Sequence, residues 1–506
     1  MSVAGRGHIT GAKLADQLPK MNFSWISKVT IEPVVLFYVF AIFAEYAVIE
    51  DLLYVSKCYN YLNLTSNDQL HTCIENKKHK SSLVSQNGTT NGTDIWKDIS
   101  AATNNALLVY NGILYATSIL SSFVAAAYSD RRSKLFPIIY PVIGSAIVQT
   151  VILVTLTIES SSGTSLIFSH TFIIFICCFI SGITGGTSTL LSTCFAYVAE
   201  KCSPSKRTTR ITIVEACLFG GGFFGFTYSG AIMRANPNSL MRYVYNFGLF
   251  LLIHLLLTAY IIFRRSLFSH PQPIASNEPG ENYFKTIFSL LTSVLKTIFR
   301  KRPHPRQRCL ILLILGAFTL ISFWNVAITT LLFIYTRNEP LVWPSWMYSY
   351  FSSAKFALCG IFLCLLPVGQ HLLTTRFNRT PLSDTTIILV GLLSRGLAIL
   401  LIGLATSTPL MVAALVVIIL AEYPIPAIRS LISKIIEVNE KAQMFVFMAT
   451  IQSICFFIGG MVFPLIYNAI FSELSSTSEM IGPFNGPGVI FIAMAIFQFI
   501  AMGIFV

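Results

Sequence analysis

Charged residues are scarce in this sequence. Asp, Glu, Lys and Arg make up only 11% of the 506 residues, whereas a soluble domain averages about 25%. Long polar segments are missing as well. The length alone would allow two soluble domains. The sequence excludes them, because it lacks the long polar segments that the surface of a soluble domain requires.

Residue patterns that support catalysis are also missing. We find no cluster with the spacing of metal ligands, no glycine-rich nucleotide loop and no nucleophile paired with a general base. The sequence therefore predicts no enzyme, no metal and no cofactor. A cleavable signal peptide is not expected either, because roughly the first twenty residues are polar and the first apolar run is long enough to span a membrane.

Long apolar runs fill the chain instead. Hydrophobic residues make up 54% of it, and runs of about 20 residues, the length that crosses a bilayer as a helix, recur from end to end. The sequence predicts an all-α membrane protein. Its twelve transmembrane helices are expected over residues 31–55, 105–128, 135–157, 167–199, 210–233, 241–263, 309–335, 345–369, 385–406, 409–434, 443–471 and 486–505.

The net charge of +13 would indicate a nucleic-acid partner in a soluble protein. Here the basic residues follow the even-numbered helices, as they do in loops on the cytoplasmic side of a membrane. We therefore expect a lipid bilayer as the partner, no nucleic acid, and both termini in the cytoplasm. The basic residues that set this orientation are Arg131, Arg132, Lys134, Lys206, Arg207, Arg264, Arg265, Arg300, Lys301, Arg302, Arg376, Arg379 and Lys441.

The polar segment 56–104 lies on the opposite side in this topology. It carries Cys58 and Cys73, which either form a disulfide or remain reduced. Three glycosylation sequons are in the same segment, at Asn63, Asn87 and Asn91. Cysteines and sequons together predict a glycosylated loop that faces the cell exterior or a lumen.

A basic linker divides the predicted helices into two sets of six. A cytoplasmic tail over 1–30 precedes the first bundle at 31–263, and the linker 264–308 leads to the second bundle at 309–506. Apolar residues at helical spacing in the linker predict either an amphipathic helix on the inner leaflet or a disordered tether. Two six-helix halves are typical of secondary transporters built from parallel repeats.

The segment AAAYSDRRSKLFP, after the second predicted helix, resembles the motif G-x-x-x-D-[RK]-x-G-[RK]-[RK] of the major facilitator superfamily. The matching residues are Asp130, Arg131 and Lys134, and the departures are Ala126, Ser133 and Leu135. An acid beside basic residues at a helix end either pairs with a neighbouring helix and latches the inner gate, or anchors the helix at the membrane surface.

The whole order of segments is similar to solute carrier family 46, the proton-coupled folate transporter family. The resemblance is carried by IEPVVLFYVF, by CFAYVAE with the following RTTRITIVEA, by IYTRNEPLVW and by PAIRSLISKIIE. It is closer to the lysosomal branch of that family than to the folate branch. It implies a major facilitator fold and a cargo among folates, conjugated steroids, cyclic dinucleotides or cell-wall fragments, moved together with protons.

The resemblance also assigns roles to residues. The proton-coupling acid of the family matches Glu215, the acid that ends the fourth helix matches Glu200, and the arginine of the tenth helix matches Arg429. We group Glu200 with the gating residues. Where the folate branch has an aspartate, a histidine and a cysteine, this chain has Gly186, Asn325 and Val342. These departures disfavour folate as the cargo and remove the loop disulfide of the folate branch.

Charged residues inside predicted helices are functional candidates in their own right, because a charge at bilayer depth costs roughly 2.5–3.5 kcal/mol on insertion scales. Glu215 is either a proton-coupling carboxyl or a structural hydrogen-bonding group. In the first helix, Glu45 is deepest and is the second proton-coupling candidate, whereas Glu50 and Asp51 are expected at the outer mouth.

The tenth helix carries Glu422 and Arg429 on either side of Pro424 and Pro426. Prolines remove helix hydrogen bonds, and transporters bind their cargo beside broken helices. Arg429 either grips an anion with its planar guanidinium or extends to the inner surface. Arg395, in the ninth helix, is either a second anion anchor or the partner of an acid. The substrate-binding candidates are thus Arg429, Arg395, Asn325 and Glu422.

These observations predict a secondary active transporter that moves an organic anion with protons by alternating access. Arg429 and Arg395 would hold the anion, and Glu215 would carry the proton. The membrane is either the plasma membrane or that of the lysosome, and the oligomeric state is open. The rival interpretation is a membrane receptor or scaffold that keeps the transporter fold without transport.

Overall fold

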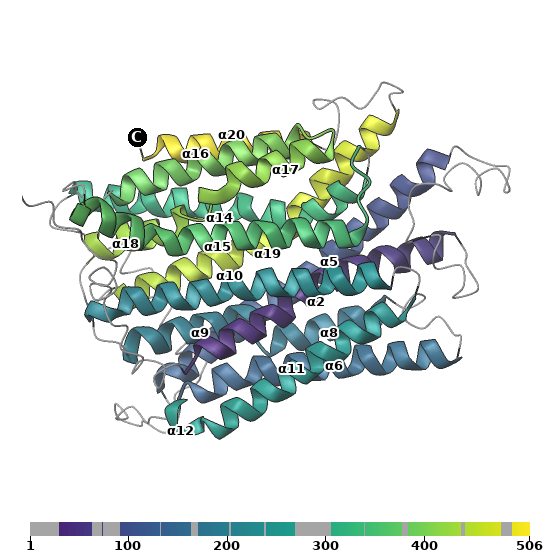
Figure 1. The fold of residues 1–506 in the computed structure, drawn as a ribbon, viewed down its shortest axis with the longest axis horizontal. Coiled ribbons are helices and arrows are strands. Elements are labelled where there is room, and N and C mark those ends of the chain that lie inside the picture. Colours follow the sequence, from purple (N-terminus) through teal and green to yellow (C-terminus); the bar gives the residue numbers. More distant parts are fainter. Residues whose placement is uncertain are drawn as a thin grey trace, which may run out of the picture.

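A computed structural model of the chain describes residues 30–62, 73, 92–131, 133–162, 171–201, 204–236, 239–268, 305–338, 340–376, 383–436, 441–476 and 488–505. Throughout this part of the chain the elements are helices, most of which run along the long axis of the molecule (Figure 1). The predicted tail 1–30, most of the linker and the three sequons lie outside the described residues.

The first half of the chain forms one group of helices. They are α2 (Glu32–Tyr61), α5 (Gly92–Arg131), α6 (Leu135–Ser162), α8 (Phe172–Ile183), α9 (Gly186–Lys201), α10 (Pro204–Ala235), α11 (Met241–Phe263) and the short α12 (Arg265–Phe268).

The second half forms the other group, at the top of Figure 1. It contains α14 (Pro305–Arg337), α15 (Ser345–Arg376), α16 (Asp384–Gly403), α17 (Thr408–Val417), the 3₁₀ turn η3 (Ile418–Leu420), α18 (Pro424–Ile435), α19 (Lys441–Ser476) and α20 (Val489–Gly503).

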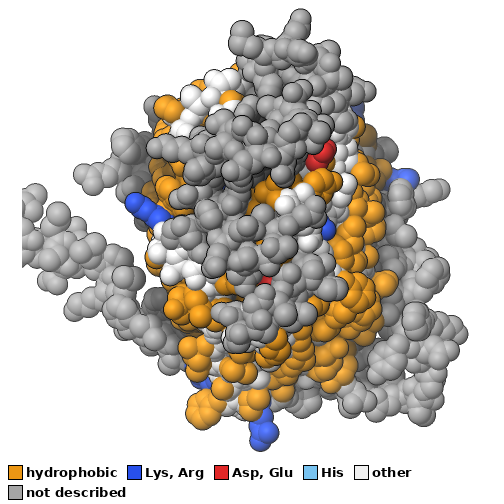
Figure 2. Space-filling view, turned by 90° about the vertical axis from the view of Figure 1, so that its right-hand side faces the viewer, with side chains coloured by type: hydrophobic (Ala, Val, Ile, Leu, Met, Phe, Trp, Pro, Cys, Tyr) orange, Lys and Arg blue, Asp and Glu red, His pale blue; other side chains and the backbone are white. Residues whose placement is uncertain are grey.

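Within the described residues, 10 helical segments are long and apolar enough to cross a membrane. The apolar α20, over Val489–Gly503, is shorter than these segments. The expected all-helical membrane class is therefore confirmed for the described residues, whereas the count of twelve spans stays a prediction. Large apolar side chains such as Leu120, Leu256 and Phe263 point outward. Figure 2 shows the same character around the rim of one end of the molecule, where hydrophobic side chains dominate and Lys or Arg are isolated.

Two predicted helices are interrupted. The expected span over 167–199 corresponds to one membrane-crossing segment, Phe172–Val198, but it is not a continuous helix. A turn separates α8 from α9 at Gly185 and Gly186, whose φ angles of +90° and +51° lie in the left-handed region that glycine readily adopts. The break expected from Pro424 and Pro426 is confirmed, because η3 and a turn separate α17 from α18 just before Pro424.

The first two helices are longer than predicted. The first was expected to end at residue 55 and the second to begin at 105, but α2 continues to Tyr61 and α5 begins at Gly92. Cys58 belongs to the last turns of α2, where it is fully buried and forms a disulfide with Cys73. The sequence predicted a loop here because the segment is polar. Val55, Cys58 and Tyr59 are nevertheless buried, and their packing stabilises the last turns of α2 as a helix. We call the end of the bundle that contains this disulfide the disulfide end, and the opposite one the α12 end.

The two halves meet along two seams. Along one, α10 lies between α2 of its own half and α15 of the other half, as Figure 1 shows. Along the other, α5 packs against α19. Phe43, Phe226 and Phe356 bring together α2, α10 and α15, with ring centroids 4.6 Å apart for Phe43 and Phe356. The seams therefore consist of side chains from both halves in direct contact.

Close packing of α10 on α2 depends on glycine. A Cβ added at Gly225 would lie 2.4 Å from the backbone oxygen of Phe40, whereas one added at Gly248 on α11 would meet nothing within 4 Å.

We therefore expect Gly225→Ala to lower the thermal unfolding midpoint of the purified protein, because overpacking costs about 1–3 kcal/mol. The matched variant Gly248→Ala should leave the midpoint unchanged or raise it, since alanine favours helix over glycine by about 1 kcal/mol. Equal midpoints for the two variants would contradict the close approach of α2 and α10.

Candidate substrate and proton site

An acid–base pair connects α10 of the first half to α18 of the second half. Glu215 on α10 and Arg429 on α18 approach to 3.5 Å between Oε1 and Nη1, and their side chains are 14% and 28% exposed. Arg429 also donates from Nη2 to Oε1 of Gln452 on α19, at 3.4 Å. The two residues that the sequence assigned to the proton and to the anion are therefore neighbours, although they lie in different halves of the chain.

A second ion pair lies inside the second half. Arg395 on α16 is only 2% exposed, and its Nη2 donates to Oε2 of Glu422 at 3.1 Å. Its Nε donates to the carbonyl oxygen of Ala421 at 2.9 Å. Its third nitrogen, Nη1, is buried and makes no hydrogen bond. Of the two alternatives for Arg395, the structure shows pairing with an acid and leaves one donor unused.

The break between α17 and α18 makes this second pair possible. Pro424 and Pro426 have no N–H with which to bond the carbonyls of Leu420 and Glu422, so the chain turns at Ala421 and its carbonyl faces Arg395. Gly391, one turn before Arg395, lets α16 approach this break: a Cβ there would lie 2.5 Å from Cδ of Pro424. Local sequence thus positions both charged side chains.

Lys355 joins this group without having been a sequence candidate. It lies on α15, and the charges of both Glu422 and Arg395 act on it. Two cations and one acid therefore share this interior region of the second half. A single Lys in the middle of a predicted helix was the signal available in the sequence, but its neighbours come from α16 and from the broken helix, which pattern alone does not place.

The remaining candidates lie elsewhere. Glu45 is buried in the first half beside Gln149 of α6, away from Arg395. Asn325 is half-buried on α14, and Lys134 is buried directly before the start of α6. The side chains of the other gating candidates, Asp130, Arg131 and Glu200, lie outside the described ones, as do the sequons at Asn63, Asn87 and Asn91. The gate assignment therefore stays a prediction.

A buried polar network closes the disulfide end, and it corrects the expectation that Asp51 sits at an open mouth. Asp51 on α2 is 1% exposed. It accepts hydrogen bonds from the guanidinium of Arg242, from the Tyr243 hydroxyl at 2.8 Å and from the Ser345 hydroxyl. Because Arg242 and Tyr243 belong to α11 and Ser345 begins α15, the carboxylate connects the two halves.

Arg337, at the end of α14, extends this network. Its Nη1 donates to the Ser345 hydroxyl at 2.9 Å, and its Nη2 donates to the carbonyl of Cys73 at 3.2 Å. The guanidinium also lies over the ring of Tyr54, 4.3 Å from its centroid. The disulfide-linked segment therefore contacts the same cluster of charges that joins the halves.

Two further ion pairs tie helices together within each half at the α12 end. Arg210 donates to Oε1 of Glu32 at 2.9 Å, which connects α10 to the start of α2. Lys434 donates to Oδ2 of Asp384 at 2.6 Å, which connects α18 to α16. The Lys434 side chain is 64% exposed, so the second pair contributes at most about 1 kcal/mol.

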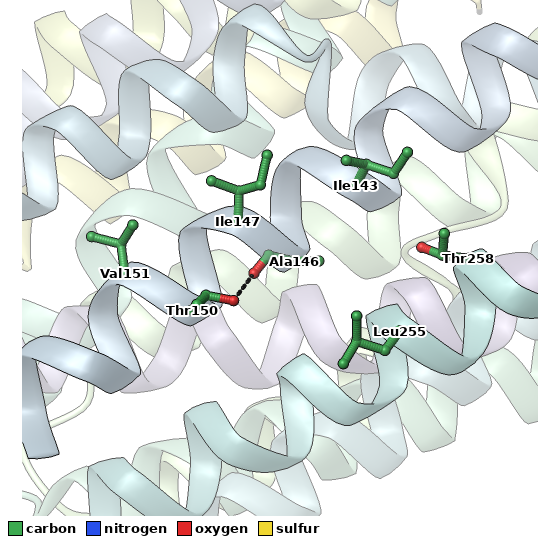
Figure 3. Close-up of a pocket in the computed structure, with 7 residues that line it drawn as sticks. All are labelled: Ile143, Ala146, Ile147, Thr150, Val151, Leu255 and Thr258. Carbon is green, nitrogen blue, oxygen red and sulfur yellow. Dashed lines mark hydrogen bonds between the residues drawn. The ribbon is translucent and has the colours of Figure 1, made fainter.

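A cleft on the surface lies away from these charges. This cleft of about 400 Å³ lies between α6 and α11, lined by Ile143, Ala146, Ile147, Thr150, Val151, Leu255 and Thr258. Figure 3 shows these side chains along the two helices, with the Thr150 hydroxyl turned back to the Ala146 carbonyl. The lining has no charged side chain, so the cleft lacks the chemistry to hold an anion.

Comparison with known proteins shows the family to which the chain belongs. The sequence matches the model of the Major Facilitator Superfamily over residues 88–383. The chain belongs to that superfamily. It is a multi-pass membrane transporter and not an enzyme.

Relatives of the transporter confirm the resemblance to solute carrier family 46. It is 26% identical to a lysosomal proton-coupled steroid conjugate and bile acid symporter of Gallus gallus, over 89% of this chain and 90% of the relative. It is 25% identical to a proton-coupled folate transporter of Bos taurus, over 57% of this chain and 58% of the relative. The crystal structure of the human organic anion transporter MFSD10 shares the fold, with a TM-score of 0.59 and 13% identity over 94% of this chain and 99% of that one.

The Arg395–Glu422 pair yields a stability prediction. Arg395→Met leaves Glu422 and the Ala421 carbonyl without their donor, and breaking a buried pair costs about 3–5 kcal/mol. We expect the thermal unfolding midpoint to fall by several degrees. The double variant Arg395→Met with Glu422→Met should recover part of the loss, because the carboxylate that lost its donor is then removed as well. A double variant less stable than the single one would contradict this account.

Proposed function

We propose that the transporter carries organic anions together with protons by alternating access of a site between its two halves. The observation that supports this most is the contact of Glu215 with Arg429 between the two halves. The carboxylate of Glu215 can be neutralised by a proton, and it is paired with Arg429, the guanidinium that would bind an anion. The proton thus binds one member of the pair and the anion binds the other.

The coupling follows from charge balance. While Glu215 is ionised, it neutralises Arg429, and the pair holds α10 and α18 together. When Glu215 takes up a proton, Arg429 loses its partner in an interior where an unpaired charge is costly. A carboxylate, sulfate or phosphate of the cargo can then accept from the guanidinium in its place. Binding of the anion therefore requires the proton, which is the condition for symport.

The charged group of Arg395, Glu422 and Lys355 in the second half suits a larger cargo. Arg395 keeps a buried donor unused, and Lys355 shares its surroundings with Arg395 and Glu422. Phe219 lies on α10 one turn beyond Glu215 and is partly buried against the apolar core. A cargo with an apolar body and an anionic group would place its charge at Arg429 and its body against such rings. Conjugated steroids and bile acids, the cargo named for the avian relative, have this form.

The orientation in the membrane belongs to the same proposal. Twelve spans place both termini and the linker 264–308 in the cytoplasm, between bundles at 31–263 and 309–506. The disulfide end then faces the cell exterior or the lysosomal lumen, where disulfides persist. Arg242 and Arg337 on this side do not contradict the distribution of basic residues, because Asp51 and its neighbours bury both of them.

The proton site is tested by uptake of radiolabelled organic anions, a steroid sulfate and folate among them, at about pH 5.5 and 7.4. We expect acid to stimulate uptake by the wild-type protein. Glu215→Gln should abolish this stimulation, because a glutamine cannot exchange a proton. Acid stimulation that survives in Glu215→Gln would contradict its role.

The anion site is tested in the same assay. Arg429→Gln should reduce uptake at least about tenfold at both pH values, because a charged hydrogen bond contributes about 1.5–3 kcal/mol. Lys434→Gln is the matched control: it removes a cation from the same helix at an exposed pair and should leave uptake near the wild-type level. Absence of flux for every compound, with the protein shown at the surface, would favour the receptor alternative.

Topology is tested by glycosylation. If the disulfide end is outside, removal of N-glycans should increase the electrophoretic mobility of the wild-type protein, and replacement of Asn63, Asn87 and Asn91 by Gln should abolish that increase. The sequons at Asn22 and Asn378 face the cytoplasm in this topology and should carry no glycan. A glycan on either of them would contradict the orientation.

A further inference from the structure

A second buried carboxyl lies next to the network at the disulfide end. Glu50 on α2 is 0% exposed. Both of its carboxyl oxygens are buried and make no hydrogen bond. It stands 18 residues beyond Glu32, about 27 Å along the helix axis. The sequence placed this residue at the outer mouth, and the structure places it inside the protein.

The surroundings of Glu50 come from both halves of the transporter. The groups nearest to its carboxyl are the phenols of Tyr46, on α2, and Tyr348, on α15. The Tyr46 hydroxyl donates to the carbonyl of Thr329 on α14, at 3.1 Å. Glu50 therefore lies on the seam, where α2 of the first half faces α14 and α15 of the second.

The adjacent acid has the opposite environment. Successive residues of a helix point about 100° apart, so Asp51 faces Arg242 and Arg337 while Glu50 faces tyrosines. Tyr115 of α5 is a further titratable group near Tyr46. Asp51 is thus neutralised by arginines, whereas no cation of the described residues acts on Glu50.

A carboxylate in this position is unstable without a proton. Moving an ionised group out of water costs several kcal/mol unless a counter-ion or hydrogen bonds compensate. Among the described residues Glu50 has no counter-ion, and its carboxyl oxygens make no hydrogen bond. Burial in the closed arrangement therefore favours the protonated form of Glu50. Separation of α2 from α14 and α15 would admit water to the carboxyl, and the charged form would then be stable.

We propose that Glu50 is a proton-binding site of the gate at the disulfide end, which holds a proton while that end is closed and releases it when that end opens. It is a second site, distinct from Glu215, and it rests on the proposed alternating access. Asp51 closes the gate by a fixed charge pair, and Glu50 makes that closure dependent on pH. Acid on the disulfide side then favours closure over a loaded site.

The chain contains its own reporter for this gate. Trp343 and Trp346 flank Ser345, the residue that Asp51 binds. Trp343 is 3% exposed and donates from Nε1 to the Thr408 hydroxyl at 3.0 Å, and Arg234 stacks over Trp346 at 5.2 Å. Opening of this end would expose both indoles. The other tryptophans, Trp25, Trp96 and Trp324, can be replaced by Phe to isolate the signal.

The experiment is acrylamide quenching of tryptophan fluorescence in the full chain, reconstituted in lipid nanodiscs without any substrate, between about pH 5 and pH 8. In the background with only Trp343 and Trp346, we expect quenching to rise with pH. Glu50→Gln imitates the protonated acid, so quenching should stay low and flat. Glu50→Asp keeps a titratable group and should restore the rise, and Lys434→Gln should behave like the background.

The outcomes separate the inference from the transport proposal. A pH-dependent rise that persists in Glu50→Gln overturns the inference, as does its absence in the background protein. The inference is also overturned if quenching fails to rise with pH in both Glu50→Gln and Glu50→Asp while the protein stays monodisperse. The shape of the glutamate side chain, and not its titration, would then determine the opening. Because no substrate is used, the absence of flux in the uptake assay leaves this result standing and affects only the proposed function.

Discussion

The cost of an unpaired charge away from water governs the arrangement of this transporter. Membrane-spanning helices can carry charged side chains only where each finds a partner or a proton. Arg395 finds Glu422, Arg429 finds Glu215, and Asp51 finds Arg242. These pairs hold helices together more selectively than apolar contact does, because lipid tails are as apolar as leucine.

The positions of the pairs decide which of them can move. Glu32–Arg210, Asp384–Lys434 and Arg395–Glu422 each join two helices of one half. Glu215–Arg429 and the contact of Asp51 with Ser345 join helices of different halves. A rearrangement that separates the halves breaks the second set and spares the first. Each half can therefore stay rigid while the contacts between the halves break and form again.

The sequence predicted the all-α membrane class and the course of most helices, because apolar runs are local signals. It also singled out Glu215 and Arg429, because the segments that contain them resemble those of a known family. It did not predict that Glu215 and Arg429 touch, since they are far apart along the chain. It also placed Glu50 and Asp51 at the outer mouth, whereas the structure buries both of them. Arg242 and Arg337 were the missed signal: arginines on the side where basic residues are rare need a buried acid.

The bond from Arg337 to the carbonyl of Cys73 has a consequence for biogenesis. Cys73 is brought to the end of α2 by its link to Cys58, and only from there does its carbonyl reach the guanidinium. The closed end thus includes a backbone group delivered by oxidation, a reaction of the secretory pathway. Reduction of that link would release an acceptor from the charge network, so formation of the Cys58–Cys73 disulfide precedes completion of this network.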